Sequence, residues 1–322
     1  MIPPRPDPSF AVVRDGETVP ARLKGGVVAI GNFDGVHRGH RAVIDEARAR
    51  ARVTSASAIA LTFEPHPRLF FRPQEPLFRL TPERAKLRLF AAAGLEGAVV
   101  MRFGAELAAL SADAFVADVL VGRLAITGVV VGADFHFGKD RAGTPEFLSA
   151  AGTRRGFMVT RVAQLMTAGK PLSSGLIRAA LAEGDVPAAT TLLGHPWFVE
   201  GTVIAGAKRG RELGVPTANI GLDPATDLKH GIYAVRVQRN GDNHDAVASF
   251  GRRPQFDNGA PLLEVFLFDF DADLYGQTLT VEFVAFIRPE MKFDSVEALV
   301  AEMKRDSGKA RAVLAQARTG KA

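Results

Sequence analysis

The hydrophobic pattern of the sequence changes near residue 190, and this change constrains the fold more than any other feature. Before it, short apolar runs alternate with stretches whose apolar spacing is typical of helices. These runs are Val27–Ile30, Ala58–Phe63, Ala98–Phe103, Ile126–Gly132 and Phe157–Val162. Strands that alternate with helices indicate parallel β-α units, so the first part is predicted to be an α/β domain with a doubly wound parallel sheet.

Two predicted helices of the first part have readable ends. In the stretch TPERAKLRLFAAAG, Thr81 is expected to cap the helix, Pro82 to occupy its first position and Gly94 to stop it. Ser111 is expected to begin the second helix. Both helices fall between apolar runs, as an alternating α/β pattern requires.

After Trp197, strand-like runs follow one another without helices between them. The runs are WFVEGTVI, IYAVRVQ, DAVASF, LLEVFLFDF and TLTVEFVAF, separated by Gly, Pro, Asn and Asp. The sequence NGDN at 240–243 is typical of a tight hairpin. Strands in this order predict a small antiparallel β-barrel.

One helix is predicted to close the chain. Asp294 is expected to cap it, and its apolar stripe contains Val296, Leu299 and Met303. The chain has 322 residues, more than one average domain. We therefore predict two domains, 1–187 and 188–322.

Charge and composition narrow the classes of partner. The net charge of +5 comes from 40 basic and 35 acidic residues without a long basic run, which suits anionic small molecules better than nucleic acid. The chain contains no cysteine, so disulfides and thiolate metal sites are excluded. No apolar stretch approaches the roughly 20 residues of a membrane helix. A cytoplasmic protein without nucleic-acid or membrane partners is expected.

The segment AIGNFDGVHRGH, residues 29–40, places two of the seven histidines in a glycine-rich turn. A metal site, a phosphate-binding turn and two surface histidines are the competing interpretations. A zinc site would need a third ligand, such as Asp34 or His66. Catalytic zinc histidines lie four residues apart on one helical face, whereas His37 and His40 are three apart around Gly39.

The order strand, glycine-rich turn and helix favours phosphate binding. Backbone N–H groups at a helix N-terminus bind phosphate oxygens. Gly31 and Gly35 allow the backbone to approach a ligand closely. Imidazoles at His37 and His40 can donate hydrogen bonds to phosphate charge that develops during a reaction. Phosphate chemistry is therefore favoured over a metal site.

GNFDGVHRGH resembles the HxGH signature of nucleotidyltransferases, in the form found in bacterial bifunctional riboflavin kinase/FMN adenylyltransferases. Further motifs appear in the order of that family: FEPHP at 63–67, LT followed by Lys86, VGADFHFGKDRAG at 131–143 and SSGLIR at 173–178. GAKRGRELGVPTANI, GIYAV, GRRPQF, EVFLFDFDADLYG and IRPEMKF resemble its riboflavin kinase module. The resemblance runs from about Val27 to Asp306.

For the first domain the resemblance implies transfer of AMP from ATP to FMN, with release of pyrophosphate. Such a reaction depends on positioning and electrostatic stabilisation. The resemblance makes His37 and His40 the catalytic residues. It assigns nucleotide and phosphate binding to Gly31, Asn32, Phe33, Asp34, Gly35, Gly39, Ser174 and Arg178, the last able to grip the β- and γ-phosphates. It assigns flavin binding to Phe63, Pro65, His66, Asp134 and Phe135, and also to Arg288, which lies in the second domain within IRPEMKF.

For the second domain it implies phosphorylation of riboflavin by ATP. Thr217 and Asn219 of the PTAN sequence are the implied oxygen ligands of the Mg²⁺ bound to ATP. Gly206, Lys208 and Gly210 are implied to bind the nucleotide. The family's general base corresponds to Glu264. From the residue pattern alone, this carboxylate in an apolar strand either faces solvent or is buried, and burial would raise its pKa.

The sequence departs from the family at several positions, among them His195 and Trp197, which replace the more usual Arg and Tyr. Gly175 replaces a threonine of the usual SSTxIR, Ser249 replaces an asparagine and Gln255 replaces a threonine. These changes leave a second hypothesis open, namely a flavin-binding protein, or an FMN adenylyltransferase with weakened or lost kinase activity. A third hypothesis, another acceptor such as nicotinamide mononucleotide, is disfavoured by the complete kinase module.

The expected small-molecule partners are ATP, riboflavin and FMN, with flavins as substrates and products. Flavoprotein apoenzymes are candidate acceptors of FAD, and the oligomeric state stays open.

Overall fold

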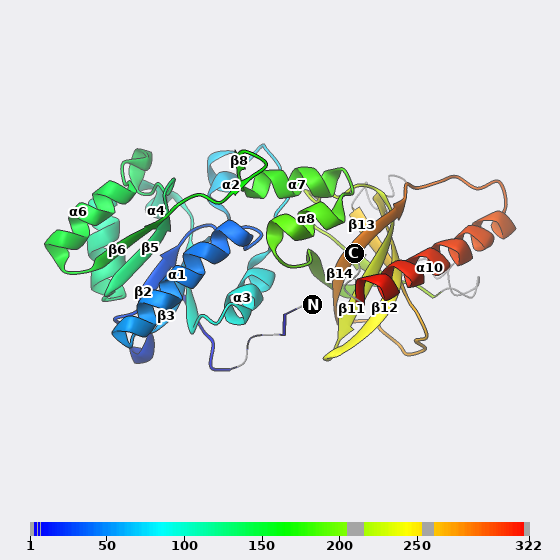
Figure 1. Cartoon of the computed structure of the whole chain (residues 1–322), viewed down its shortest axis with the longest axis horizontal. Coiled ribbons are helices and arrows are strands. Elements are labelled where there is room, and N and C mark those ends of the chain that lie inside the picture. The colour runs from blue at the N-terminus through cyan, green and yellow to red at the C-terminus, as the bar shows by residue number, and fades with distance from the viewer. Residues whose placement is uncertain (1–2, 5, 7, 205–215, 253–260, 319–322) are drawn as a thin grey trace. The chain divides into compact units, whose positions relative to one another are not determined.

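The computed structural model describes residues 3–4, 6, 8–204, 216–252 and 261–318 (Figure 1). It forms two compact units. The parallel-sheet unit comprises Pro3–Leu77 and Thr81–Ser173, and the barrel unit comprises Phe78–Leu80 and the described residues from Ser174 onward. Each unit has its own hydrophobic core.

The parallel-sheet unit contains a six-stranded sheet in the order β1-β4-β3-β2-β5-β6, in which every neighbouring pair is parallel. The strands are β1 (Ala11–Arg14), β2 (Val27–Ile30), β3 (Ala58–Glu64), β4 (Gly97–Arg102), β5 (Gly128–Gly132) and β6 (Met158–Val162). The predicted doubly wound α/β fold is confirmed. The edge strand β1 adds to the predicted set; its sequence AVVR has only three consecutive apolar residues before a charged one.

Helices and short turns connect these strands. The helices are α1 (Arg38–Thr54), α2 (Pro67–Phe71), α3 (Glu83–Ala92), α4 (Ala105–Ala109), α5 (Ala112–Ala114), the π-helix η2 (Phe115–Arg123) and α6 (Pro145–Arg155). The turns η1 (Ala21–Leu23) and η3 (Lys139–Arg141) are 3₁₀, and β7 (Met166–Thr167) pairs with β8 (Lys170–Pro171). α1 packs on β2 and β5, and α3 packs on β4. Apolar strand residues such as Val28, Ile59 and Val99 pack instead in one buried cluster with residues of η2 and α6.

Helix ends test the predicted capping residues. Gly94 adopts φ +77° immediately after α3, and the Ser111 hydroxyl accepts a hydrogen bond from the Ala114 N–H, so both predictions are confirmed. Thr81 is not the cap of α3, because the helix begins at Glu83 and the Thr81 side chain bonds elsewhere. The prediction that Asp294 caps the last helix is also wrong. Ser295 accepts the hydrogen bond from Ala298 N–H at the start of the last helix.

The barrel unit contains a closed antiparallel barrel in the order β10-β13-β12-β11-β14-β9, which confirms the predicted barrel. Its strands are β9 (Phe198–Ile204), β10 (Ala218–Gly221), β11 (Gly231–Arg239), β12 (Asp242–Arg252), β13 (Pro261–Leu267) and β14 (Thr278–Arg288). A two-residue turn joins β11 to β12, with φ of +50° at Asn240 and +97° at Gly241. Positive φ at both positions is typical of the tight hairpin that NGDN predicts.

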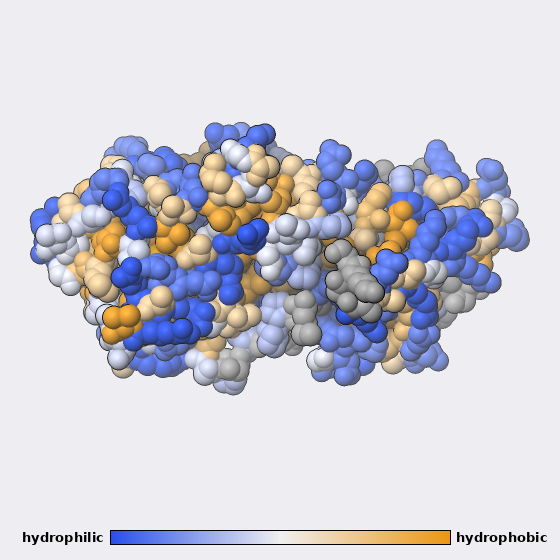
Figure 2. Space-filling model, in the orientation of Figure 1, coloured by the Kyte–Doolittle hydropathy of each residue, from blue (hydrophilic) through white to orange (hydrophobic). Residues whose placement is uncertain are grey.

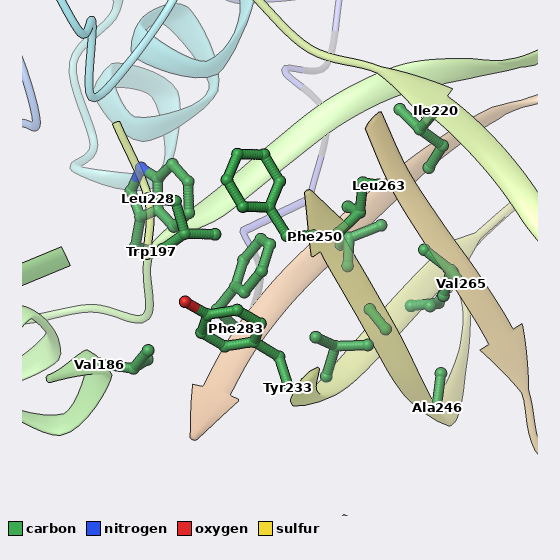
Figure 3. Close-up of a cluster of buried hydrophobic side chains, with 14 of the residues drawn as sticks. Val186, Trp197, Ile220, Leu228, Tyr233, Ala246, Phe250, Leu263, Val265 and Phe283 are labelled. Atoms are coloured by element: carbon green, nitrogen blue, oxygen red, sulfur yellow. The ribbon is translucent and has the colours of Figure 1, made fainter. Parts of the chain in front are cut away.

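Aromatic side chains fill the barrel core (Figure 3). The rings of Trp197 and Phe283 lie 4.9 Å apart, and Tyr233 meets Phe283 edge-on at 5.2 Å. The Trp197 Nε1–H donates to the Leu80 carbonyl at 3.0 Å, which ties a distant segment to the same unit. Truncating a buried tryptophan typically costs about 3–5 kcal/mol, so Trp197 is a main anchor of this core.

Three helices complete the barrel unit: α7 (Ser174–Ala182), α8 (Val186–Leu193) and α10 (Val296–Arg318). The predicted closing helix is α10, whose Ala310 and Leu314 pack against barrel residues such as Ala234 and Phe268. Ion pairs fasten it as well, notably between Arg288 and Asp306 at 2.7 Å.

Hydrophilic side chains cover much of the visible faces of α1 and α10 (Figure 2), as expected for amphipathic surface helices. Within the described residues, no helix has both the length and the apolar character needed to cross a bilayer.

Candidate functional site

The turn between β2 and α1 has an unusual backbone. Phe33, Gly35 and Val36 have φ values of +51°, +89° and +41°. Glycine adopts such values freely, whereas a β-branched residue such as Val36 does so at a cost. The turn therefore depends on contacts with the rest of the unit to keep this shape.

Thr81 supplies part of that support. Its hydroxyl accepts a hydrogen bond from Gly35 N–H at 2.8 Å, and its own N–H donates to Asp34 Oδ1 at 3.0 Å. Asp34 is 2% exposed, so its side chain holds the turn from inside the protein. This brace explains why Thr81 does not cap α3.

Phe33 packs beneath the turn. Its ring meets Phe90 of α3 and His40 of α1 edge-on, at 5.2 and 5.4 Å. A Cβ on Gly31 would lie 3.2 Å from the Phe33 ring, so glycine leaves room for this ring. Asn32 is the exposed residue of the sequence Asn32–Asp34. Of the turn residues predicted to bind nucleotide, Phe33 and Asp34 thus shape the turn from its buried side.

His37 and His40 stack on each other, with ring centroids 3.6 Å apart and planes 16° apart. His37 is the N-cap of α1, and its Nδ1 accepts the His40 N–H at 3.3 Å. A neutral His37 therefore carries its proton on Nε2, where it can donate to a ligand. A Cβ on Gly39 would lie 3.2 Å from His37 Nδ1, which explains the glycine of HxGH.

Two observations indicate that His40 is neutral. Its Nδ1 is buried and has no hydrogen-bond partner within the described part of the chain, so an imidazolium would leave one N–H unsatisfied. Burial, followed by the charges of His37 and Lys86, holds the pKa of His40 well below its usual range. His37 can therefore donate a hydrogen bond from Nε2 while the stacked His40 ring stays uncharged. Two positive charges then do not lie side by side.

The predicted flavin residues of the parallel-sheet unit lie at the ends of β3 and β5. His66 caps α2 by accepting the Arg68 N–H at 3.1 Å, and Pro65 is exposed. Phe63 is largely buried beside Phe103. In the second group, Asp134 is exposed, and the half-buried Phe135 ring stacks on Phe137 at 5.6 Å. The carboxyl ends of parallel strands are where open α/β sheets bind ligands.

In the barrel unit, strand register places three polar residues in one row. Glu264 of β13 lies opposite Asn219 of β10 on one side and opposite Ser249 of β12 on the other. Directly paired residues share a face, with Cβ atoms about 5 Å apart. Leu263 and Val265 belong to the buried core, so alternation places Glu264 on the outer face of the barrel, where it is half-buried.

Asn219 carries the strongest sign of a binding site in this row. It is 6% exposed, and its Oδ1 is buried without a hydrogen-bond partner in the described chain. Its Nδ2 donates weakly to the carbonyl of Thr217 at 3.5 Å. An unpaired amide oxygen beside a threonine suits a hard cation such as Mg²⁺. These two residues therefore fit the predicted ligand set.

The remaining predicted residues have structural partners or lie outside the description. Arg288 binds Asp306 at 2.7 Å and approaches Glu302 at 3.7 Å, so its side chain fastens α10. Arg178 Nε donates to the Phe78 carbonyl at 2.6 Å, and Ser174 begins α7. Both belong to the barrel unit. Gly206, Lys208, Gly210 and Gln255 lie outside the described residues.

Sequence reasoning singles out Thr81 and Lys86 as motif residues but does not predict that they support the turn. Thr62, Thr81 and Lys86 are polar and almost fully buried. Thr81 and Lys86 lie within a helix-like pattern, in which Thr81 is the expected cap. Only the tertiary structure, which places them beneath the turn, shows that they support it.

Two family models match the chain. The FAD synthetase model covers residues 19–176, and the riboflavin kinase model covers residues 193–314. With the α/β fold and the barrel, these matches define a two-domain enzyme of flavin nucleotide synthesis. The predicted boundary after residue 187 lies in the interval that neither model covers.

Curated relatives match the chain over nearly its full length. The bifunctional riboflavin kinase/FMN adenylyltransferase of Pseudomonas fluorescens is 41% identical over 91% of this chain and 94% of that protein. The enzyme of the same name from Escherichia coli K12 is 38% identical over 90% and 93%. The chain belongs to the bifunctional riboflavin kinase/FMN adenylyltransferase family.

A solved structure shares the whole fold. The crystal structure of a protein described as a macrolide-efflux protein, from Streptococcus pneumoniae, has a TM-score of 0.83 and 31% identity. It covers 93% of this chain and 98% of its own. The description as an efflux protein belongs to that protein alone. The structural likeness supports the two-unit architecture described above.

Proposed function

We propose that the barrel unit phosphorylates riboflavin to FMN at the row of Glu264 and Asn219, and that the parallel-sheet unit converts FMN to FAD at the turn of His37 and His40. The observation that supports this assignment is that each unit gathers reactive side chains at one place. In one unit these are stacked imidazoles at a helix N-terminus. In the other they are a carboxylate and an unpaired amide in strand register.

In the kinase reaction, the Glu264 carboxylate accepts the proton of the riboflavin 5′-hydroxyl. The hydroxyl oxygen attacks the γ-phosphorus of ATP, and ADP leaves. A bound Mg²⁺, held by Thr217 and Asn219, would neutralise phosphate charge. The pairing of Asn219 with Glu264 in strand register supports a phosphate site and a base on one face of the barrel.

In adenylyl transfer, a phosphate oxygen of FMN attacks the α-phosphorus of ATP, and pyrophosphate leaves. Negative charge increases on the α-phosphate oxygens in the transition state. His37 donates from Nε2, and the neutral His40 ring stacks beside it. Free N–H groups at the start of the 17-residue helix α1 add positive potential at the same point.

Other roles rest on the resemblance alone. They comprise phosphate binding by Ser174, Arg178, Gly206, Lys208 and Gly210, and flavin binding by Phe63, Pro65, His66, Asp134 and Phe135. Flavin binding by Arg288 also rests on the resemblance, and its guanidinium forms an ion pair with Asp306. A boundary after residue 187, a cytoplasmic location and transfer of FAD to flavoprotein apoenzymes complete the proposal.

The test is a chromatographic time course with purified protein, riboflavin, ATP and Mg²⁺. FMN is expected to appear first and then to decline as FAD accumulates. A reaction started with FMN instead of riboflavin isolates the second step. Absence of FAD in both reactions would overturn the assignment of the turn.

A second candidate function is adenylyl transfer with a weakened kinase. It is favoured by Ser249, which lies directly opposite Glu264 and which the family resemblance expects to be asparagine. This candidate predicts FAD from supplied FMN but little FMN from riboflavin. The same two reactions therefore separate both candidates.

A further inference from the structure

Lys86 is a lysine in an unusual place. It lies on α3, one helical turn before Phe90, and it is 1% exposed. Lysine is almost never fully buried unless it is paired. Neither proposed reaction assigns a role to this residue.

Hydrogen bonds connect Lys86 to two segments of the parallel-sheet unit. Its Nζ lies 2.8 Å from Glu64 Oε1 and 3.3 Å from Thr62 Oγ1. Thr62 donates in turn to the carbonyl of Asn32 at 3.3 Å. Lys86 is thereby linked to the turn of the HxGH motif through Thr62 and to the FEPHP segment through Glu64.

The segment from Thr81 to Phe90 holds the same turn at two further points. Thr81 binds the backbone of Gly35 and the side chain of Asp34. Phe90 packs against Phe33, whose ring also meets His40. Three contacts from one segment fix a turn whose backbone is strained at Val36.

We propose that Lys86 is a positioning residue for adenylyl transfer, whose buried ammonium fixes the turn through Thr62 and places positive charge behind His40. This inference rests on the proposed site of FAD formation. The charge supports neutral His40 and favours phosphate at the turn, while Glu64 and Thr62 satisfy the ammonium. The other titratable group that acts on His40 is His37, whose ring stacks on it.

The test compares two variants, Lys86→Met and Lys86→Met with Glu64→Gln. The single variant leaves Glu64 without its partner in a largely buried place, so it can lose activity simply through misfolding. The double variant replaces the ion pair by a neutral pair of similar volume. Lys24→Met, at an exposed lysine of the same unit, is the matched control.

In the double variant, kcat for FMN to FAD is expected to fall about 10- to 100-fold, with KM for FMN and ATP changed much less. Its decline on acidification is expected to begin at higher pH, because His40 no longer has a positive neighbour in Lys86. Phosphorylation of riboflavin, measured on the same protein, is expected to stay within twofold. Lys24→Met is expected to leave both reactions unchanged.

A double variant with wild-type FAD formation and an unchanged pH profile would overturn the proposal. The ion pair would then contribute to folding but not to adenylyl transfer. Failure of the proposed site itself gives a different result. In that case His40→Ala would also leave FAD formation intact.

Discussion

The two candidate sites are built in different ways. In the barrel unit, strand register alone brings Asn219, Glu264 and Ser249 into one row, because paired residues of antiparallel strands share a face. In the parallel-sheet unit, the turn around His37 takes its shape from side chains far away in sequence, such as Thr81. The geometry of the barrel site thus depends on the strand register of a sheet. The geometry of the turn site depends on a network of buried polar side chains.

This difference implies different sensitivities. A substitution in the barrel row removes one function and leaves the sheet intact. A substitution under the turn disturbs geometry and stability together, since a buried donor loses its partner. The predictions that follow test this contrast, beginning with the largest expected effect.

Glu264→Gln is expected to slow FMN formation by about 10²- to 10⁴-fold, because the amide cannot accept the proton of the riboflavin hydroxyl. Conversion of supplied FMN to FAD is expected to be unaffected. Chromatographic rates for the two reactions measure both effects. Glu297→Gln, at an exposed position of α10, serves as control. Equal loss of both reactions would contradict the assignment of separate sites.

His40→Ala is expected to reduce FAD formation by about 10²- to 10³-fold, through loss of an imidazole that helps to stabilise developing phosphate charge. Riboflavin phosphorylation in the same protein is the internal control. Single-turnover rates with ATP and FMN measure the chemical step. A normal rate in this variant would show that the stacked histidines act elsewhere.

Thr81→Val is expected to destabilise the parallel-sheet unit by about 1–3 kcal/mol, because Gly35 N–H loses its buried acceptor. The one tryptophan, Trp197, and both tyrosines belong to the barrel unit. Circular dichroism should therefore report the shift in urea unfolding, while Trp197 fluorescence should change less. Thr153→Val, at an exposed helix position, is the control, and equal shifts in both variants would contradict the prediction.

The smallest expected effect concerns pH. His40 has a pKa below its value in the unfolded chain, so the unfolded state binds more protons as pH falls below about 6.5. Stability is then expected to decrease by at most about 1.4 kcal/mol per pH unit until the folded pKa is reached. Urea unfolding at pH 7.5, 6.5 and 5.5 measures it. In His40→Gln, the part of the pH dependence of unfolding free energy that comes from His40 should disappear. A variant with the same pH dependence as the wild type would show that His40 is not its cause.

Local patterns were sufficient to predict much of the molecule. Alternating apolar runs predict the parallel sheet, and the sequence NGDN predicts the β11–β12 hairpin, because both depend on residues close together in the chain. The HxGH motif likewise predicts a turn at a helix start, and the structure adds that His37 is its N-cap. The resemblance identifies the family.

Other features depend on contacts that no local pattern contains. Thr81 looks like a helix cap and Asp34 like a phosphate contact, yet they bind each other across 47 positions of sequence. Lys86 belongs to a motif in the sequence, and only the fold shows that it is enclosed with Glu64 and Thr62. The sequence by itself determined which elements form and where the motifs fall. Tertiary structure alone decided which polar groups are buried together, because burial and pairing depend on segments that meet only after folding.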